Sequence, residues 1–285
     1  MLGFLNDKLK KSDSQGTGKV IALMNQKGGV GKTTMAYNMA HALKSKGHKV
    51  LCIDMDPQFN FSLLFGEYVP DQLNVHHLLI NSVRELKPMH TEAFLSEVIK
   101  KSSSGIDILC AGQELSGFEL SVAGISGPRQ LILKKFIESN ALKERYDYIV
   151  IDGPPTLGLL VVNILCACDG VLFPFIPDAF SEQGLRNIRN VLLDIGEMGI
   201  VTPPKILGYI PNLFEARRKK SREDFNHIKD EFSDGEIFEP FMNRAHFARS
   251  MANKKSVFDY EASDYKELQG QFMNVVGSIE NQLMS

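Results

Sequence analysis

The sequence predicts an α/β fold in which helices flank a doubly wound, mostly parallel sheet. The first indication is an apolar run at 20–24 that leads through a glycine-rich loop into a helical pattern at 35–43. The second is a series of short apolar runs with the length of strands, at 49–54, 106–110, 146–152, 170–175 and 205–210. Helical patterns separate most of these runs, and strands that alternate with helices form parallel sheets covered on both faces.

The loop between the first strand and the first helix has the composition of a phosphate-binding loop. Residues 25–34 read Asn-Gln-Lys-Gly-Gly-Val-Gly-Lys-Thr-Thr. Glycines let backbone N–H groups turn toward phosphate oxygens, and the first turn of the following helix adds unpaired donors and the positive end of its dipole. We expect this loop to bind a nucleotide through Lys27, Gly28, Gly29, Val30, Gly31, Lys32, Thr33 and Thr34.

The two lysines of this loop are predicted to have different targets. Lys32 is expected to reach the β- and γ-phosphates, and the hydroxyl of Thr33 is expected to ligate Mg²⁺. Lys27 stands at the entrance of the loop, after Gln26, which takes the position where the general pattern has a glycine. A lysine at this entrance points away from the phosphates of its own loop unless a second nucleotide is brought up to it.

Carboxylates follow two of the predicted strands. Asp54 and Asp56 lie two residues apart after the strand at 49–54, so their side chains share a side of an extended segment. Asp152 ends the strand at 146–152, and an apolar strand that ends in aspartate is a Walker B pattern, expected to hold Mg²⁺ directly or through water. In a parallel sheet these strand ends face the same crevice as the loop. A simple Asp-Pro turn is the alternative for Asp56.

Three motifs together resemble the ParA/MinD superfamily of ATPases, and within it the ParA/Soj-type partition ATPases. They are the K-G-G-x-G-K-T-T loop, the segment Asp-Met-Asp-Pro-Gln at 54–58, and the block at 146–158, within a resemblance that covers 19–284. The resemblance implies a deviant Walker A loop whose Lys27 reaches the ATP of a partner subunit. It also implies that Asp56 positions the attacking water and that Asp54 supports the magnesium shell.

The resemblance therefore assigns roles to particular residues. It implies catalytic roles for Lys27, Lys32 and Asp56 and metal ligation by Thr33, Asp56 and Asp152. It places the adenine pocket at 211–214, with Pro211 and Asn212 as the expected contacts, and it places Arg217 nearer the dimer interface.

Basic residues are clustered although the net charge is only −2. Residues 215–222 hold five basic side chains and one acidic one, and residues 244–255 hold four basic side chains and no acidic one. By resemblance, non-specific DNA contacts are expected at Arg218, Lys219, Lys220, Arg222, Arg244, Arg249, Lys254 and Lys255. For Lys219, Lys220 and Arg222 the dimer interface is the alternative. A solvated helix face is the ordinary alternative. Without a motif that reads bases, such contacts would be made to phosphates.

The rest of the chain is predicted to be a tail or linker at 1–18 and a single ATPase domain at 19–285. The segment 1–11 is a frayed or locally packed terminus, or else an amphipathic membrane contact. The helix expected at 262–284 has an apolar stripe but no basic residue after Lys266, which favours core packing over membrane binding. Buried, reduced thiols are expected at Cys52, Cys110, Cys166 and Cys168.

Four less distinctive segments complete the prediction. Helices are expected at 75–83, 91–101 and 130–144, and a loop-rich, mobile segment is expected at 111–127 because it carries four glycines.

The resemblance implies a function. The expected protein is an ATP-dependent homodimer for plasmid or chromosome partition, which uses ATP and Mg²⁺. It binds DNA non-specifically on the nucleoid in the cytoplasm. It is released from DNA when a ParB-type partner stimulates slow hydrolysis. Two alternatives stay open, namely a MinD-like membrane ATPase anchored by 1–11 and a ParA-like positioner of another cargo. ATP-dependent amidoligases and the nitrogenase iron protein are disfavoured, because the basic clusters have no use there and no cluster-ligating cysteine pattern is present.

Overall fold

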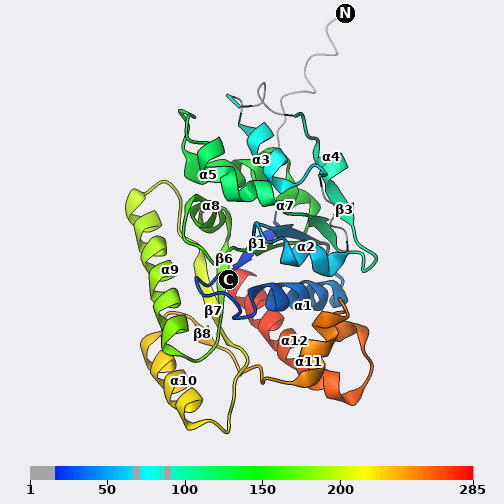
Figure 1. The fold of residues 1–285 in the computed structure, drawn as a ribbon, viewed down its shortest axis with the longest axis vertical. Coiled ribbons are helices and arrows are strands. Elements are labelled where there is room, and N and C mark those ends of the chain that lie inside the picture. The colour runs from blue at the N-terminus through cyan, green and yellow to red at the C-terminus, as the bar shows by residue number, and fades with distance from the viewer. Residues whose placement is uncertain (1–16, 67–70, 84, 87–90, 285) are drawn as a thin grey trace, which may run out of the picture.

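A central eight-stranded sheet organises the computed structural model, which describes residues 17–66, 71–83, 85–86 and 91–284 (Figure 1). The strand order is β3-β4-β2-β5-β1-β6-β7-β8, and all neighbours are parallel except β3 and β4. The strands are β1 Lys19–Leu23, β2 Val50–Asp54, β3 Ile99–Lys101, β4 Asp107–Leu109, β5 Tyr148–Asp152, β6 Gly170–Phe175, β7 Lys205–Pro211 and β8 Glu236–Ile237. The predicted fold class is confirmed.

Helices cover both faces of this sheet. Those that pack on one face are α1 Lys32–Ser45, α2 Asn60–Phe65, α11 Ala245–Ala252 and α12 Ser263–Met284. Those that pack on the other are α3 Val75–Ser82, α5 Phe118–Ser121, α6 Ile132–Ser139, α8 Leu159–Ala167, α9 Ala179–Met198 and α10 Lys219–Glu231. Because β1, β2, β5 and β6 are covered on both sides, they read as continuous apolar runs without alternation.

Two further predictions, on the last helix and on the cysteines, are confirmed. The stripe of α12 is buried, from Tyr265 through Phe272 to Ile279, so this helix packs into the core as expected. All four cysteines are free and buried. Among the described helices, none combines the length and the apolar character needed to cross a bilayer. The membrane alternative for 1–11 falls on residues outside the described part of the chain.

Three predicted segments are wrong in part. The helix expected at 91–101 is only one turn, α4 Leu95–Val98, because Ile99 and Lys101 pair antiparallel with β4 instead. The helix expected at 130–144 is divided into α6 and α7 Leu142–Arg145 by Ala141, whose φ is 51°. The loop expected at 111–127 contains short helical turns that bury Leu115, Phe118 and Val122.

The break at Ala141 gives a stability prediction. An alanine held in the left-handed region costs about 1 kcal/mol relative to glycine, so Ala141→Gly should raise the free energy of unfolding by about 0.5–1 kcal/mol. Urea denaturation would measure it. The same substitution at the exposed Ala248, inside α11, should instead lower stability by about 1 kcal/mol. Equal effects at the two sites would contradict the strain assigned to Ala141.

Candidate nucleotide site and basic surfaces

The phosphate-binding loop follows β1, the strand that lies between β5 and β6 at the middle of the sheet. Gly29 and Gly31 take φ values of 75° and 94°, which side chains rarely adopt. A Cβ atom at Gly31 would lie 2.1 Å from Nδ2 of Asn212, so the loop also requires glycine there for space. Turns of this kind can direct backbone N–H groups toward a bound anion.

Lys32 lies inside this loop. Its side chain is 6% exposed, and its Nζ donates to the carbonyl of Lys27 at 3.3 Å. Burial lowers the pKa of Lys32, and the charges of Asp152 and Asp56 oppose that shift. A buried ammonium held between the loop and two carboxylates is well placed to meet the phosphates of a nucleotide.

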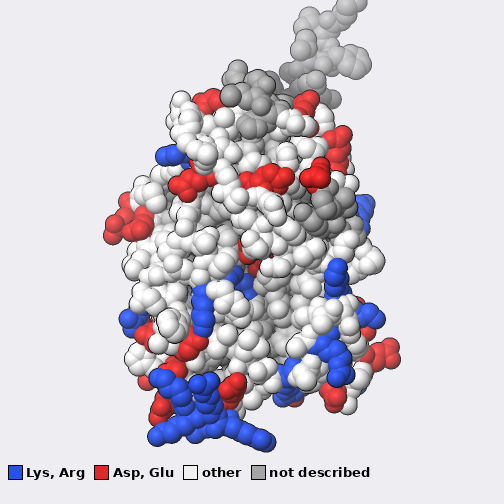
Figure 2. Space-filling model, viewed as in Figure 1, with Lys and Arg blue, Asp and Glu red and all other residues white. Residues whose placement is uncertain are grey.

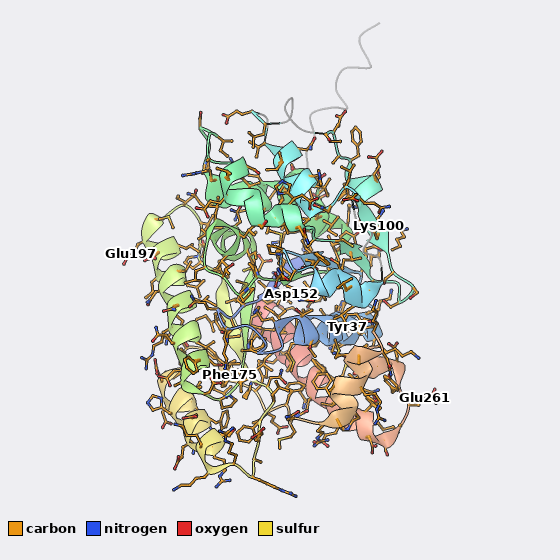
Figure 3. The ribbon with its side chains drawn as sticks, in the orientation of Figure 1. Tyr37, Lys100, Asp152, Phe175, Glu197 and Glu261 are labelled. Atoms are coloured by element: carbon orange, nitrogen blue, oxygen red, sulfur yellow. The ribbon has the colours of Figure 1, made fainter. Side chains whose placement is uncertain are left out.

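Thr33 and Asp152 meet behind the loop. The hydroxyl of Thr33 donates to Oδ2 of Asp152 at 2.6 Å, and Asp152 is fully buried (labelled in Figure 3). The other carboxylate oxygen, Oδ1, has no hydrogen-bond partner in the described structure. Burial raises the pKa of Asp152 well above its usual range, and the nearby charge of Asp54 adds to this effect. An unpartnered carboxylate oxygen beside a hydroxyl is a ligand set that fits Mg²⁺.

Asp54 positions its own segment. Its Oδ2 accepts hydrogen bonds from the backbone N–H and the hydroxyl of Ser62, at 2.8 and 2.7 Å, and its Oδ1 accepts one from the N–H of Asp56 at 3.1 Å. Burial raises the pKa of Asp54 to about 7. Both oxygens thus fix the turn that carries Asp56, and the support of a magnesium shell expected of Asp54 stays a prediction.

Asp56 lies at the edge of an open cleft of about 380 Å³. The side chain is 9% exposed, and its Oδ1 accepts a hydrogen bond from the N–H of Gln58 at 3.0 Å. Pro154 and Leu157, which follow the Walker B strand, line the same cleft. Asp56 thus lines the open cleft, whereas Asp54 is fully buried.

Lys27 lies outside its own phosphate loop. Its ammonium forms an ion pair with Asp178 and lies 5.9 Å from the ring centroid of Phe180, which is 79% exposed. Asp178 also caps α9, since its Oδ1 accepts from the N–H of Ser181 at 2.8 Å. Sequence reasoning missed Asp178, although an aspartate three residues before a serine at a helix start is a capping signal.

Asn212, at the end of β7, faces the loop from the other side. Its Nδ2 donates to the carbonyl of Val30 at 2.9 Å, whereas its buried Oδ1 has no partner in the described structure. Pro211 precedes it as the last residue of β7. An unpartnered carbonyl oxygen beside a phosphate loop can accept a hydrogen bond from the amino group of a purine. The structure thus brings the loop, Asp56, Asp152 and Asn212 around one site.

The amino-acid sequence of the chain is similar to those of known proteins. A family profile described as an AAA domain matches residues 18–199. The chromosome-partitioning ATPase Soj of Treponema pallidum is 32% identical over 222 residues, which cover 76% of this chain and 80% of that protein. The chain belongs to the ParA/Soj family of P-loop ATPases.

Solved structures agree with this assignment. The complex of a McdA variant from Cyanothece with ATP has a TM-score of 0.80 at 22% identity and covers 93% of this chain and 97% of its own, a likeness that shows the fold alone. Cobyrinic acid a,c-diamide synthase from Mycobacterium smegmatis, with a bound ATP analogue and magnesium, has a TM-score of 0.69 at 28% identity and covers 80% of this chain and 86% of its own. One of these neighbours therefore binds ATP, and the other binds an ATP analogue with magnesium.

This ParA/Soj-type ATPase carries two basic surfaces. The first basic surface surrounds the start of α10 and consists of Arg217, Arg218, Lys219, Lys220 and Arg222. The second basic surface lies at the end of α11 and consists of Arg249, Lys254 and Lys255. Figure 2 shows lysines and arginines gathered toward the lower end of the molecule, over α10 and separately on the side of α11.

The expected DNA contacts differ in how far acidic neighbours compensate their charge. Arg244 is bound by Glu267 through two guanidinium nitrogens, so it is less available than its sequence position indicates. On α10, Lys220 lies 2.7 Å from Asp224 and Lys219 lies 3.5 Å from Glu223. In the part of the chain that the structure describes, no carboxylate pairs with the second basic surface. That surface therefore presents the least compensated charge.

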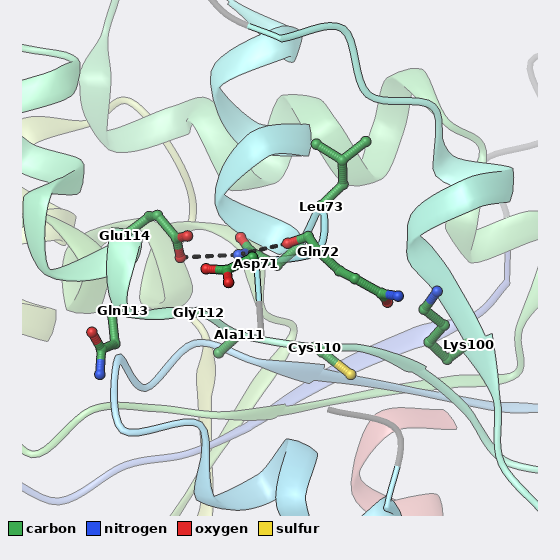
Figure 4. A pocket seen from close by; sticks show the side chains of 10 residues that line it. Asp71, Gln72, Leu73, Lys100, Cys110, Ala111, Gly112, Gln113 and Glu114 are labelled. Carbon is green, nitrogen blue, oxygen red and sulfur yellow. Dashed lines mark hydrogen bonds between the residues drawn. The ribbon is translucent and has the colours of Figure 1, made fainter. Parts of the chain in front are cut away.

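Two other features, a small cavity and a cluster of titratable side chains, are not part of this site. A cavity of about 80 Å³ at the carboxyl end of β4 is crossed by the hydrogen bond from Asn74 to Glu114, and it is too small for a nucleotide (Figure 4). Glu182, His227 and Glu231 lie close enough to share a metal ion. Arg186 binds both of these carboxylates, so the group is an ion-pair network between α9 and α10.

The geometry predicts the effect of removing the inner lysine. Lys32→Ala should weaken ATP binding by at least a hundredfold, about 3 kcal/mol, because the phosphates lose their only buried ammonium in the described loop. Isothermal titration calorimetry would measure this. Lys44→Ala, the same substitution in the last turn of α1, should leave the affinity unchanged. Tight ATP binding by Lys32→Ala would contradict the assignment of the loop.

Proposed function

We propose that this partition-type ATPase works as a nucleotide-switched dimer that binds DNA non-specifically. In this proposal ATP joins two copies through Lys27, the dimer coats DNA, and a ParB-type partner stimulates slow hydrolysis that releases it. The observation that carries the proposal is that the two lysines of one loop lie in different places. Lys32 fills the loop, whereas Lys27 lies outside it on the exposed side, beside Asp178.

The chain's own residues would perform the chemistry as follows. The loop N–H groups and Lys32 hold the phosphates, and Asn212 accepts a hydrogen bond from the adenine amino group. Thr33 and Asp152 would hold Mg²⁺, which supplies charge neutralisation at the β- and γ-phosphate oxygens. Asp56, with Asp54 fixing its turn, orients the attacking water and could also contact the metal. Lys27 exchanges Asp178 for the phosphates of the partner's nucleotide, so that only the dimer is complete.

Binding to DNA follows from the second basic surface. It offers three exposed, uncompensated charges on each subunit, and a dimer doubles that number. Contacts to phosphates release counterions and make affinity steeply dependent on salt, with no reading of sequence. The first basic surface supplies further, partly compensated charge, through Arg218, Lys219, Lys220 and Arg222. We assign both surfaces to the DNA backbone.

Co-sedimentation with non-specific plasmid DNA tests the whole proposal. The protein should sediment with DNA in ATP but not in ADP or without nucleotide. Asp56→Ala should prolong binding in ATP, because the dimer forms but cannot orient water for hydrolysis. Light scattering should show the Asp56→Ala dimer persisting in ATP. A protein that ignores DNA in every nucleotide state would refute the proposal.

The rival functions predict different responses. A MinD-like membrane ATPase would bind anionic liposomes in ATP and lose that binding when 1–11 is deleted. An amidoligase, the class that the synthase neighbour's name implies, would turn over ATP in response to an amide donor and would ignore DNA. A positioner of another cargo would share all the chemistry, and a partner pulldown would separate it from a partition protein.

Charge reversal tests the surfaces separately. Arg249→Glu with Lys255→Glu should reduce the slope of log affinity against log salt by about 2 per subunit, since each lost phosphate contact removes about 0.9. ATP hydrolysis without DNA should be unchanged. Lys229→Glu, an exposed lysine at the far end of α10, is the matched control and should alter the slope little. An unaltered slope in the double variant would indicate that the second basic surface is an ordinary solvated face.

A further inference from the structure

The side chain of Asn38 joins α1 to the segment that carries the second basic surface. Asn38 is fully buried, and its Nδ2 donates to the carbonyl of Thr34 at 2.9 Å and to the sulfur of Met251 at 3.4 Å. Its Oδ1 accepts from the hydroxyl of Ser256 at 3.0 Å and from the N–H of Val257 at 2.8 Å. One side chain thus bonds α1, α11 and the residues just after the second basic surface.

Tyr37 makes the neighbouring connection. Its hydroxyl donates to the carbonyl of Lys254 at 3.2 Å, across 217 residues of sequence. Its ring packs against His41 and Phe65, with centroids 4.4 and 5.0 Å apart. Figure 3 labels Tyr37 on α1, above the segment that contains α11. The hydroxyl is therefore directed at the basic turn, while the ring is anchored in the core.

The turn held by Tyr37 has an unusual residue at its strained position. Lys254 has a φ of 53°, and the N–H groups of Lys254 and Lys255 bond back to Met251 and Ser250, both at 3.0 Å. These two hydrogen bonds form the Schellman motif that ends α11, in which the left-handed residue is usually glycine or asparagine. A lysine there costs about 1 kcal/mol. Strain of this kind persists where surrounding contacts hold it, and it is found at functional sites.

The same helix begins in the nucleotide site. Lys32 and Thr33 stand in the first turn of α1, and the carbonyl of Thr34 is already bonded to Asn38. At 1.5 Å per residue, Thr33 and Asn38 are separated by roughly 7.5 Å along the helix axis. A shift of the first turn on phosphate binding would therefore reach Tyr37 and Asn38 through one rigid turn of helix.

We propose that Tyr37 and Asn38 are positioning residues that couple nucleotide occupancy to the second basic surface. Nucleotide bound at the start of α1 sets the position of this turn, and the turn sets the backbone at 254–257 through the hydrogen bonds of Tyr37 and Asn38. The DNA part of this inference rests on the proposed function, whereas the mechanical link does not. By linkage, DNA bound at the turn must raise nucleotide affinity by the same factor that nucleotide raises DNA affinity.

Hydrogen exchange tests the link without DNA. A non-hydrolysable ATP analogue with Mg²⁺, at a saturation checked by calorimetry, should slow exchange at the amides of Lys254, Lys255 and Val257 at least threefold. Tyr37→Phe removes only the hydroxyl, and Ser256→Ala removes one bond to Asn38. Each variant should reduce that response, and the two together should reduce it further, although the bond from the N–H of Val257 to Asn38 remains. The matched control is Tyr146→Phe, which loses a buried tyrosine hydrogen bond to Asp107 elsewhere and should keep the full response.

Each outcome decides the inference. Unchanged exchange in the saturated wild-type protein, or a full response in the double variant, would overturn it, as would an equal loss in Tyr146→Phe, which would indicate general loosening. A DNA titration then separates the two proposals. If exchange responds as expected but DNA binds in no nucleotide state, the coupling stands and the proposed function fails. If DNA binds, Tyr37→Phe should reduce the analogue-induced gain in DNA affinity at least threefold.

Discussion

The site is organised by an imbalance of buried charge. Asp54, Asp56 and Asp152 are gathered at the ends of two neighbouring strands, and Lys32 is the one cation identified among them in the described structure. Carboxylates out of water are stable only if they are protonated, hydrogen-bonded or paired. Asp54 is satisfied by Ser62, and Asp152 is partly satisfied by Thr33. The remaining deficit is the physical reason that a divalent cation belongs here, and a triphosphate brings further negative charge to the same place.

Much of this centre could be predicted because its determinants are local. The glycines of the loop, the helix behind it and the apolar strand that ends in Asp152 are each specified within about ten residues, and parallel pairing places their ends together. The edge of the sheet could not be predicted in the same way. Ile99 and Lys101 belong to a strand only because β4 lies beside them. The local sequence has a helical pattern, from which that pairing cannot be predicted.

The contacts that assign roles to residues are mostly distant in sequence. Lys27 meets Asp178 across 151 residues, and Asn212 meets Val30 across 182. Resemblance indicated Asn212, because it places an adenine pocket there. It gave no reason why the side chain at this position should be an amide. The structure supplies one, since the Nδ2 that donates to the loop excludes a side chain at Gly31, and Oδ1 has no hydrogen-bond partner in the described structure. Asp178 carried only a helix-capping signal, so its ion pair with Lys27 could not be foreseen.

Helix α1 connects the nucleotide site to the basic turn at 254–257. Its first turn carries Lys32 and Thr33, and Tyr37 and Asn38 follow about one turn later. Tyr37 and Asn38 place polar atoms where a core would ordinarily place apolar ones, and both are satisfied by the turn at 254–257. A glycine at position 254 would form the same turn with less strain but would present one charge fewer. The fold therefore does not itself require a lysine at this position.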